Sequence, residues 1–217
     1  MIDPQNLLLS VKDLSCFKGD NPLFQNLSFT LKQGNGIHLT GRNGSGKTTL
    51  LRCLAGLNKN FSGYIDLIDN NSLKNIKLNS NILYIGHQNA LNDRLTPLEN
   101  LTWWYSLHNK SNDQFTKFDL IKLLNSLDLK NEIYKPCYQL SAGQKRRVSL
   151  VKLYFSEHKL WILDEPFTSL DKESITIFEH KIINHLKKGN LLLMTNHQTL
   201  SFDLTNLNID EYQSKLS

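Results

Sequence analysis

One short segment combines glycines, a lysine and a threonine in a spacing that suits phosphate binding. GRNGSGKT, residues 41–48, fits the pattern G-x-x-x-x-G-K-[ST]. The glycines allow successive backbone N–H groups to turn towards phosphates, and Lys47 could reach the β- and γ-phosphates. The hydroxyl of Thr48 could bind Mg²⁺. The candidate phosphate-binding residues are therefore Gly41, Arg42, Asn43, Gly44, Ser45, Gly46, Lys47, Thr48 and Thr49.

A pair of acids ends the apolar run LWILDEP. Asp164 and Glu165 follow a predicted strand, and open parallel sheets bind their ligands at that edge. Asp164 could hold Mg²⁺ through water, and Glu165 could orient and deprotonate a water that attacks a γ-phosphate. On their own, the two acids could equally be a solvated strand end before a proline turn. The phosphate loop upstream favours the catalytic interpretation.

Two further polar residues follow strand-like segments. Gln88 ends ILYIGHQ and His197 ends LLLMTNH. If both segments are parallel strands, both side chains lie at the same edge of the sheet and close to the γ-phosphate, where Gln88 could join Thr48 and Asp164 around Mg²⁺. An isolated glutamine or histidine at a strand end is more often a surface or capping residue. Gln88 and His197 can therefore be assigned to the site only together with the other motifs, taken in their order along the chain.

The segment QLSAGQKRRV, residues 139–148, opens a helical pattern with a serine and a glycine. A helix N-terminus can bind an anion. However, no acid, metal ligand or nucleophile accompanies this segment, and one nucleotide should not need two phosphate-binding loops. The residues alone therefore leave the role of this segment open.

The segments around these residues predict an α/β fold. LLLSVKDL and NLSFTL alternate apolar and polar residues and predict a small N-terminal antiparallel sheet. Short apolar strands at GIHLT, ILYIGHQ, LWILDEP and NLLLMTNH, separated by helical patterns, predict a mainly parallel sheet covered on both faces. We predict one domain, 1–217, with a nucleotide-binding core at 1–88 and 139–217 and a helical subdomain at 89–138.

Composition limits the class of protein. The chain has 217 residues, is 40% hydrophobic and has three widely spaced cysteines without a C-x-x-C pair, which disfavours a disulfide framework or a zinc site. Its apolar runs are far shorter than the ~20 residues of a membrane span, and its start does not resemble a secretion signal, so we expect a cytoplasmic protein. The net charge of +5 suits an anionic ligand, an acidic lipid surface or nucleic acid, and discriminates only weakly among them.

In chain order, the motifs resemble those of the ATP-binding subunits of ABC transporters. The set comprises GRNGSGKT, Gln88, LSAGQ at 140–144, WILDEP with SLD at 169–171, and His197. The glycine loop alone would also fit small GTPases, helicases and kinases, but LSxGQ directly upstream of ILDEP is specific to this family. The resemblance implies a P-loop NTPase (RecA-like) core in the ABC ATPase fold, with ATP and Mg²⁺ as ligands and ATP hydrolysis as the activity.

The resemblance also implies a partner copy. Two such subunits pair head to tail, and the signature of one closes over the ATP of the other. The signature residues would be Leu140, Ser141, Ala142, Gly143 and Gln144. Phe17 would stack on adenine and Asp171 would contact the partner copy. Ala142 replaces a glycine that most relatives have, and its methyl group could alter the approach to the partner's γ-phosphate.

Several stretches resemble one branch of the family, the ATP-binding subunit of the bacterial cytochrome c maturation haem exporter. These stretches are DLSCF, PLFQNLSF, GHQ, LTPLENL, QLSAGQKRRVSL and LWILDEPFTSLD. This implies integral membrane transporter subunits as partners, at the cytoplasmic face of the bacterial inner membrane, and ATP hydrolysis that drives release of a haem-loaded chaperone. The chain lacks C-x-x-C-H, so we expect no direct haem binding, and we interpret every histidine except His197 as a structural or surface residue.

Two alternatives remain open. A small exporter cassette for lipid, peptide or lipoprotein would have the same motifs. An ABC ATPase that acts on nucleic acid or ribosomes is less favoured, because such proteins generally have two cassettes in one chain or long coiled coils in the insert. We therefore expect no nucleic-acid partner.

The insert contains three consecutive aromatic residues, Trp103, Trp104 and Tyr105. They cannot all face one side of a helix, so at least one should be exposed or partly covered. A partner surface and a local core of the helical lobe explain them equally well. On the partner interpretation, Trp104→Asp should weaken association with membrane subunits and leave nucleotide binding intact.

Overall fold

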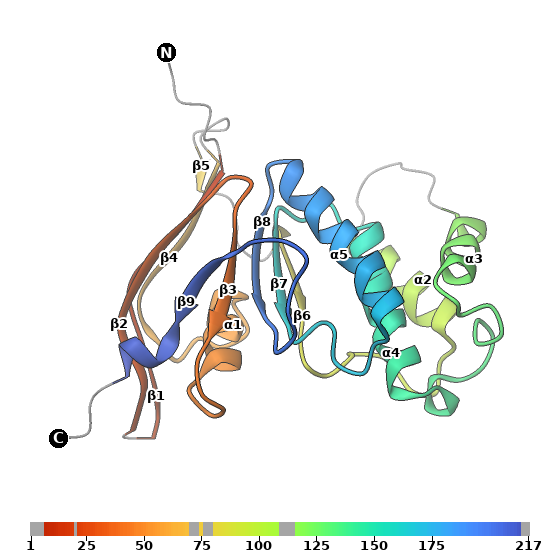
Figure 1. The fold of residues 1–217 in the computed structure, drawn as a ribbon, viewed down its shortest axis with the longest axis horizontal. Helices are drawn as coiled ribbons and strands as arrows, with labels where there is room; N and C mark the ends of the chain where they lie inside the picture. Colours follow the sequence, from red (N-terminus) through yellow and green to blue (C-terminus); the bar gives the residue numbers. More distant parts are fainter. Residues whose placement is uncertain (1–6, 20, 70–73, 76–79, 109–115, 214–217) are drawn as a thin grey trace, which may run out of the picture.

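The computed structural model describes residues 7–19, 21–69, 74–75, 80–108 and 116–213. An antiparallel sheet forms one end of the molecule (Figure 1). Its strands are β1 (Leu7–Lys18), β2 (Asn21–Lys32), β4 (Ser62–Asp69) and β5 (Lys74–Asn75), in the order β2-β1-β4-β5. The alternating patterns of the N-terminal segments predicted its first two strands, and the structure confirms them.

A parallel sheet occupies the centre. Its strands are β3 (Gly36–Thr40), β6 (Ile82–Ile85), β7 (Leu160–Asp164), β8 (Leu191–Thr195) and β9 (Thr205–Asn208), in the order β6-β7-β8-β3-β9. Every residue of β7 and β8 is buried, as expected for strands covered on both faces. The polar strand β9 at the edge has no apolar pattern and was not predicted.

Hydrophobic cores lie on both faces of this sheet. Leu160 and Ile162 of β7 belong to the core that contains α1 (Lys47–Leu54) and the antiparallel sheet. Trp161 and Leu163 point to the other face and join the core of the remaining helices. The phosphate-loop helix is therefore packed between the two sheets, which fixes its position.

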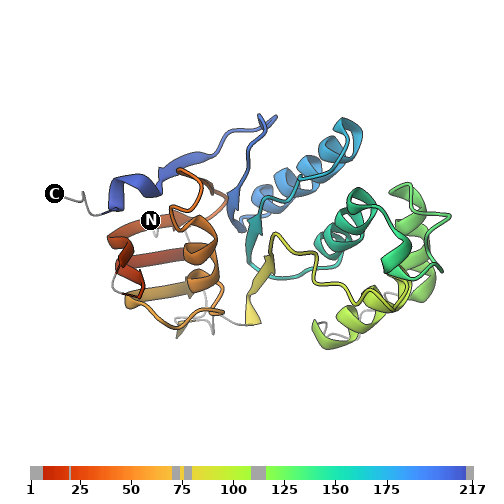
Figure 2. The ribbon, with the colours of Figure 1, turned by 90° about the horizontal axis from the view of Figure 1, so that it is seen from below.

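The other helices are α2 (Pro97–His108), α3 (Lys117–Ser126), α4 (Ala142–Leu150) and α5 (Lys172–Lys187). Figure 2 shows α2 and α3 at the end of the molecule opposite the antiparallel sheet. Short 3-10 turns lie at Cys137–Gln139, Val151–Tyr154 and Ile209–Tyr212. The architecture confirms the predicted α/β fold with an antiparallel N-terminal sheet.

The aromatic run in α2 is divided between core and surface. Trp103 is 63% exposed, whereas Trp104 is 9% exposed. The ring of Trp104 stacks on His108 with centroids 4.0 Å apart and lies 5.5 Å from the ring of Phe155. The use of Trp104 as a probe of a docking surface was therefore wrong, because this side chain belongs to the core and Trp103 is the exposed residue.

Candidate functional site

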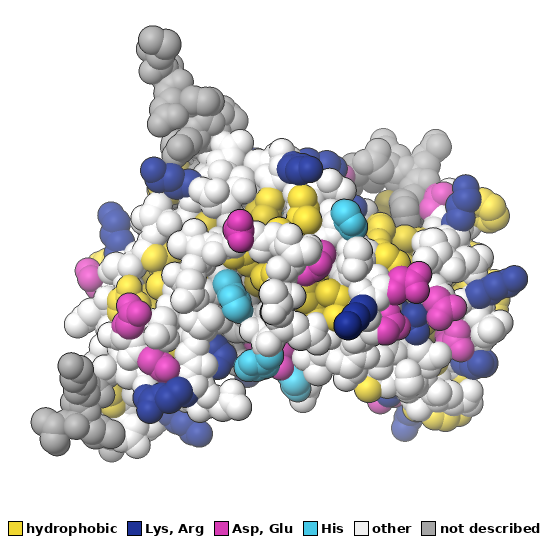
Figure 3. Space-filling model, in the orientation of Figure 1, with side chains coloured by type: hydrophobic (Ala, Val, Ile, Leu, Met, Phe, Trp, Pro, Cys, Tyr) yellow, Lys and Arg dark blue, Asp and Glu magenta, His cyan; other side chains and the backbone are white. Residues whose placement is uncertain are grey.

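The predicted site residues converge where the parallel strands end. The phosphate loop follows β3, Gln88 follows β6, Glu165 follows β7 and His197 follows β8. These strands are parallel neighbours, so their carboxyl ends share one edge of the sheet. In Figure 3, histidine side chains gather on the lower middle of the face shown.

The phosphate loop has the backbone that its glycines predict. Gly41, Gly44 and Gly46 have φ values of 144°, 81° and 101°. A Cβ on Gly41 would lie 2.6 Å from Ile209, and one on Gly46 would lie 3.2 Å from Leu23. Larger residues at these two positions would therefore be strained and crowded.

Lys47 begins α1 and points back across the loop. Its Nζ donates to the carbonyl oxygens of Gly41 at 2.7 Å and Arg42 at 3.0 Å. Within the described chain, no side chain caps the N-terminus of α1, so its first N–H groups can receive an anion. The Oγ of Ser45 is buried and lacks a hydrogen-bond partner among the described residues.

A cavity of about 610 Å³ lies beside the loop. Its lining includes Thr48, Arg52, Tyr84, Gln88, Ser149 and Lys152. Arg52 and Lys152 make the lining basic, and burial together with the charge of Arg146 lowers the pKa of Lys152 to about 8. The structure thus places Thr48 and Gln88 around one hollow with a basic wall, which suits an anionic ligand.

Asp164 is buried at the end of β7 and is 2% exposed. Its Oδ1 accepts a hydrogen bond from Thr195 Oγ at 2.7 Å, while Oδ2 has no partner among the described residues. An orphaned, buried carboxylate oxygen is costly unless a ligand satisfies it. The site therefore fits a hard cation such as Mg²⁺, whose preferred ligands are oxygens.

Glu165 lies between two histidines. Its Oε1 lies 3.1 Å from His197 Nε2, and its Oε2 lies 3.6 Å from His87 Nδ1. The N–H of Glu165 donates to Thr195 Oγ at 2.9 Å, and its φ is 48°. The interpretation of His87 as an ordinary surface or structural residue missed this contact, although His87 directly precedes Gln88.

The signature segment starts α4 with a reciprocal cap. Ser141 Oγ accepts from the N–H of Gln144 at 3.2 Å, and Gln144 Oε1 accepts from the N–H of Ser141 at 2.8 Å. A Cβ on Gly143 would lie 2.6 Å from the carbonyl oxygen of Ser169, so glycine is needed for this close approach. Ala142 is exposed as the first residue of α4, and Leu140 is buried.

Two further residues, Phe17 and Asp171, were predicted from family resemblance alone. Phe17 lies on β1 and is 47% exposed. It pairs with Pro22 of β2, and the next residue, Leu23, faces Gly46 of the phosphate loop. Asp171 caps α5, because its Oδ1 accepts from the N–H of Ser174 at 2.7 Å. This hydrogen bond lowers the pKa of Asp171. The cap gives Asp171 a local structural role in addition to any contact with a partner copy.

The C-terminal segment supports the phosphate loop and was not predicted to do so. Asp210 Oδ2 accepts from the N–H of Arg42 at 3.0 Å, and Gln213 Nε2 donates to the carbonyl oxygen of Ser45 at 3.1 Å. The Arg42 guanidinium donates to Gln213 Oε1 at 2.9 Å. The tail therefore braces the loop, which its sequence did not indicate.

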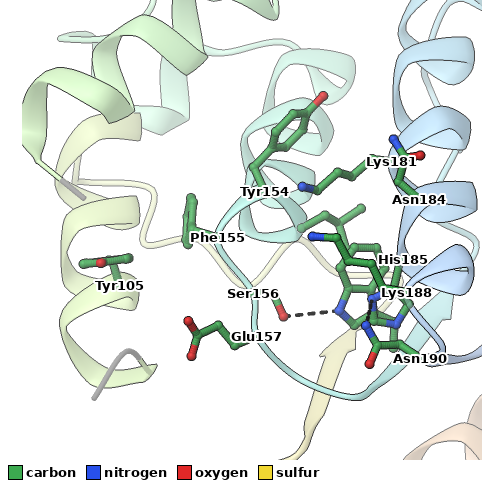
Figure 4. Close-up of a pocket in the computed structure, with 12 residues that line it drawn as sticks. Tyr105, Tyr154, Phe155, Ser156, Glu157, Lys181, Asn184, His185, Lys188 and Asn190 are labelled. Carbon is green, nitrogen blue, oxygen red and sulfur yellow. Dashed lines mark hydrogen bonds between the residues drawn. The ribbon is translucent and has the colours of Figure 1, made fainter. Parts of the chain in front are cut away.

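A smaller hollow of about 340 Å³ lies at the opposite edge of the sheet (Figure 4). Its lining includes Ser156, Trp161, Lys181, His185 and Asn190, close to the amino ends of β7 and β8. His185 stacks on Trp161 with centroids 3.7 Å apart, and burial lowers its pKa to about 4. This agrees with a structural histidine, and the hollow holds none of the predicted site residues.

Comparisons with known proteins identify relatives of the chain. A family model described as "ABC transporter" matches residues 24–168. The "Cytochrome c biogenesis ATP-binding export protein CcmA" of Photobacterium profundum is 38% identical over 210 residues, which cover 92% of this chain and 97% of the relative. No helix in the described part of the chain is long and apolar enough to cross a membrane.

Solved structures share the fold. A putative ABC transporter ATP-binding protein from Pyrococcus furiosus has a TM-score of 0.77 at 23% identity, covering 95% of this chain and 100% of that one. An ATP-binding cassette in a dimeric, post-hydrolysis state bound to ADP and Pi has a TM-score of 0.73 at 20% identity, covering 88% of each chain.

Proposed function

Because this chain belongs to the ABC transporter family, we propose that its ATP hydrolysis drives the haem-export step of cytochrome c maturation, in which a haem-loaded chaperone is released. The family membership and the relative named for cytochrome c biogenesis support the export role. The observation that supports hydrolysis is the position of Glu165, between His197 and His87 and directly after the buried Asp164. This geometry suits activation of a water beside a nucleotide.

Phosphate binding uses the loop 41–49. When ATP binds, Lys47 exchanges its bonds to the loop carbonyls for the β- and γ-phosphates, and the N–H groups at the start of α1 face the phosphates. Thr48, Gln88 and Asp164 would hold Mg²⁺, partly through water. Bound Mg²⁺ would supply neutralising charge at the phosphates. Phe17 stacks on the adenine.

Glu165 orients the attacking water and accepts its proton. Its Oε1 already contacts His197, which holds the carboxylate in place and can itself face the γ-phosphate. Thr195 fixes both the backbone N–H of Glu165 and Oδ1 of Asp164. The two acids are thus positioned by one hydroxyl group on the neighbouring strand.

Two copies of the chain form the complete sites. The dimeric state of a solved cassette with the same fold supports this arrangement. In the head-to-tail pair, the N-terminus of α4, with Ser141 and Gly143, closes over the ATP of the other copy. Asp171, at the start of α5, contacts the partner copy.

The helical insert docks on integral membrane subunits at the cytoplasmic face of the bacterial inner membrane. Trp103 and Tyr134 are both more than half exposed and line one groove of about 530 Å³, together with Leu95 and Leu98. Exposed aromatic side chains beside an apolar groove are typical of protein interaction surfaces.

We expect Trp103→Asp and Trp104→Asp to separate docking from folding. Trp103→Asp should retain the wild-type Tm and ATP affinity but reduce co-purification with the membrane subunits at least ~10-fold. Trp104→Asp should lower the free energy of unfolding by about 3–5 kcal/mol, because it leaves a cavity in the core. Thermal denaturation and pull-down of tagged variants measure both effects. Unchanged co-purification of Trp103→Asp would exclude this docking surface.

Gene deletion tests the transported substrate. We expect the deletion strain to lack covalent haem in its c-type cytochromes, measured by haem staining of gels, and the wild-type gene to restore it. Glu165→Gln should fail to restore staining. If the deletion strain kept normal c-type cytochromes, the haem-export role would be wrong and a lipid, peptide or lipoprotein exporter would become the better candidate.

A further inference from the structure

Arg146 lies in α4 and contacts the segment that carries the hydrolytic acids. The residue is 3% exposed. Its Nε donates to the carbonyl oxygen of Pro166 at 2.8 Å, and its Nη2 donates to those of Asp164 at 2.9 Å and Glu165 at 2.8 Å. One guanidinium group therefore holds three successive carbonyl groups at the end of β7.

The other arm of the same guanidinium holds the segment after β6. Nη1 donates to the carbonyl oxygen of Gly86 at 2.8 Å and to Asn89 Oδ1 at 3.2 Å. Ser149, also in α4, donates from its hydroxyl to the carbonyl oxygen of Asn89 at 3.0 Å. Gln88 lies between the two residues that Arg146 binds, so α4 fixes both ends of the short segment around it.

The bonding capacity of Arg146 is completely used. A guanidinium group has five N–H donors, and the structure provides five acceptors, four of them backbone carbonyls. Burial lowers the pKa of Arg146 to about 10, so the group remains charged at neutral pH. Because the acceptors are mainly backbone groups, Arg146 specifies the path of the chain.

The backbone at Glu165 needs such support. Its φ of 48° lies in the left-handed region, which is unfavourable for a residue with a side chain and persists only where the surroundings impose it. Arg146 binds the carbonyl oxygen of Glu165 and those of its two neighbours, Asp164 and Pro166. The direction of the Glu165 side chain, and hence its distance to a water, follows from this backbone conformation.

We propose that Arg146 is a positioning residue for ATP hydrolysis, which holds the backbone of Glu165 and ties it to the segment of Gln88. The inference rests on the proposed roles of these two residues. Since the signature residues begin the same helix, Arg146 also connects the surface that meets the partner's ATP with the hydrolytic glutamate of its own chain.

Arg146→Lys tests the inference, in full-length chain co-expressed with its membrane subunits. Lysine has three donors without the planar fork, so at least two acceptors lose their partner. We expect kcat, counted per bound ATP, to fall ~30-fold or more, with the Kd for ATP changed less than about twofold, because misplacement of a catalytic group slows the chemical step. Loss of folded protein would lower the number of ATP-binding sites and would not alter turnover per site.

Arg147→Lys is the matched control. Arg147 is the next residue in α4, but its Nη1 contacts Leu127 and Asp128, away from the acids. The variant Arg147→Lys should retain wild-type turnover.

A second variant, Asn89→Ala, removes one acceptor of the Arg146 guanidinium and should lower kcat about three- to tenfold without a change in Tm.

The following results would overturn the inference. The first is a turnover of folded Arg146→Lys within about twofold of the wild type. The second is an equal loss in kcat and in ATP affinity in that variant. If Arg146→Lys does not fold, an unchanged kcat in Asn89→Ala has the same consequence. A wild-type chain without ATPase activity would instead overturn the proposed function, whereas Glu165→Gln with normal activity would overturn the role of Glu165 on which the inference rests.

Discussion

Glu165→Gln should bind ATP normally and hydrolyse it at least ~100-fold more slowly than the wild type, because general-base catalysis typically contributes 10²–10⁴-fold. The substitution removes the carboxylate that we propose accepts the proton of the attacking water. It retains the size of the side chain and an oxygen that can face His197, whose Nε2 lies 3.1 Å from Oε1 in the wild type. Steady-state phosphate release and equilibrium binding of ATP measure the two effects separately.

The same variant should accumulate as a dimer in Mg-ATP, because in the proposed head-to-tail pair ATP that is not hydrolysed would keep two copies closed around it. Size-exclusion chromatography with and without Mg-ATP shows this directly. Glu157→Gln is the matched control, since Glu157 is exposed at the opposite edge of the sheet. Turnover of Glu165→Gln close to that of the wild type would assign the base to another residue, and His87 would be the first to test.

The phosphate loop and the strand-end acids could be predicted because their chemistry is local in sequence. GRNGSGKT contains its own glycines, lysine and threonine, and Asp164 and Glu165 are set by the strand before them. Parallel strands then bring Gln88 and His197 to the same edge without further information. The order of these motifs was enough to predict the fold class, which the solved structures of related fold confirm.

The remaining parts depend on contacts that the sequence does not show. Asp210 supports Arg42 from 168 residues away, and the edge strand β9 is polar, so no hydrophobic pattern marks it. Arg146 is of the same type as its neighbours Lys145 and Arg147, and only its contacts with the carbonyl groups after β6 and at the end of β7 show that it is buried. The faces of α2 were ambiguous for a similar reason, because Phe155, which covers Trp104, follows α4 in the chain.

Lys47→Ala should weaken ATP binding ~10- to 100-fold, because it removes charged hydrogen bonds that typically contribute ~1.5–3 kcal/mol. In the structure, Nζ of Lys47 bridges the carbonyl groups of Gly41 and Arg42, so the ammonium group is already held at the centre of the loop. When ATP binds, the ammonium group needs only to turn from these carbonyl oxygens towards the phosphates. Isothermal titration with ATP measures the loss.

Lys59→Ala provides the control, since Lys59 is an exposed lysine that follows the helix of the phosphate loop. Lys59→Ala should match the wild type in affinity for ATP, which would show that the loss in Lys47→Ala does not come from the net charge of the chain.

Loss of the hydrogen bonds from Lys47 to the two carbonyl groups could also loosen the loop. However, Asp210 and Gln213 brace the loop independently of Lys47, so the Tm of Lys47→Ala should stay within a few degrees of the wild type. Wild-type affinity in Lys47→Ala would show that the backbone N–H groups of the loop suffice to hold the phosphates.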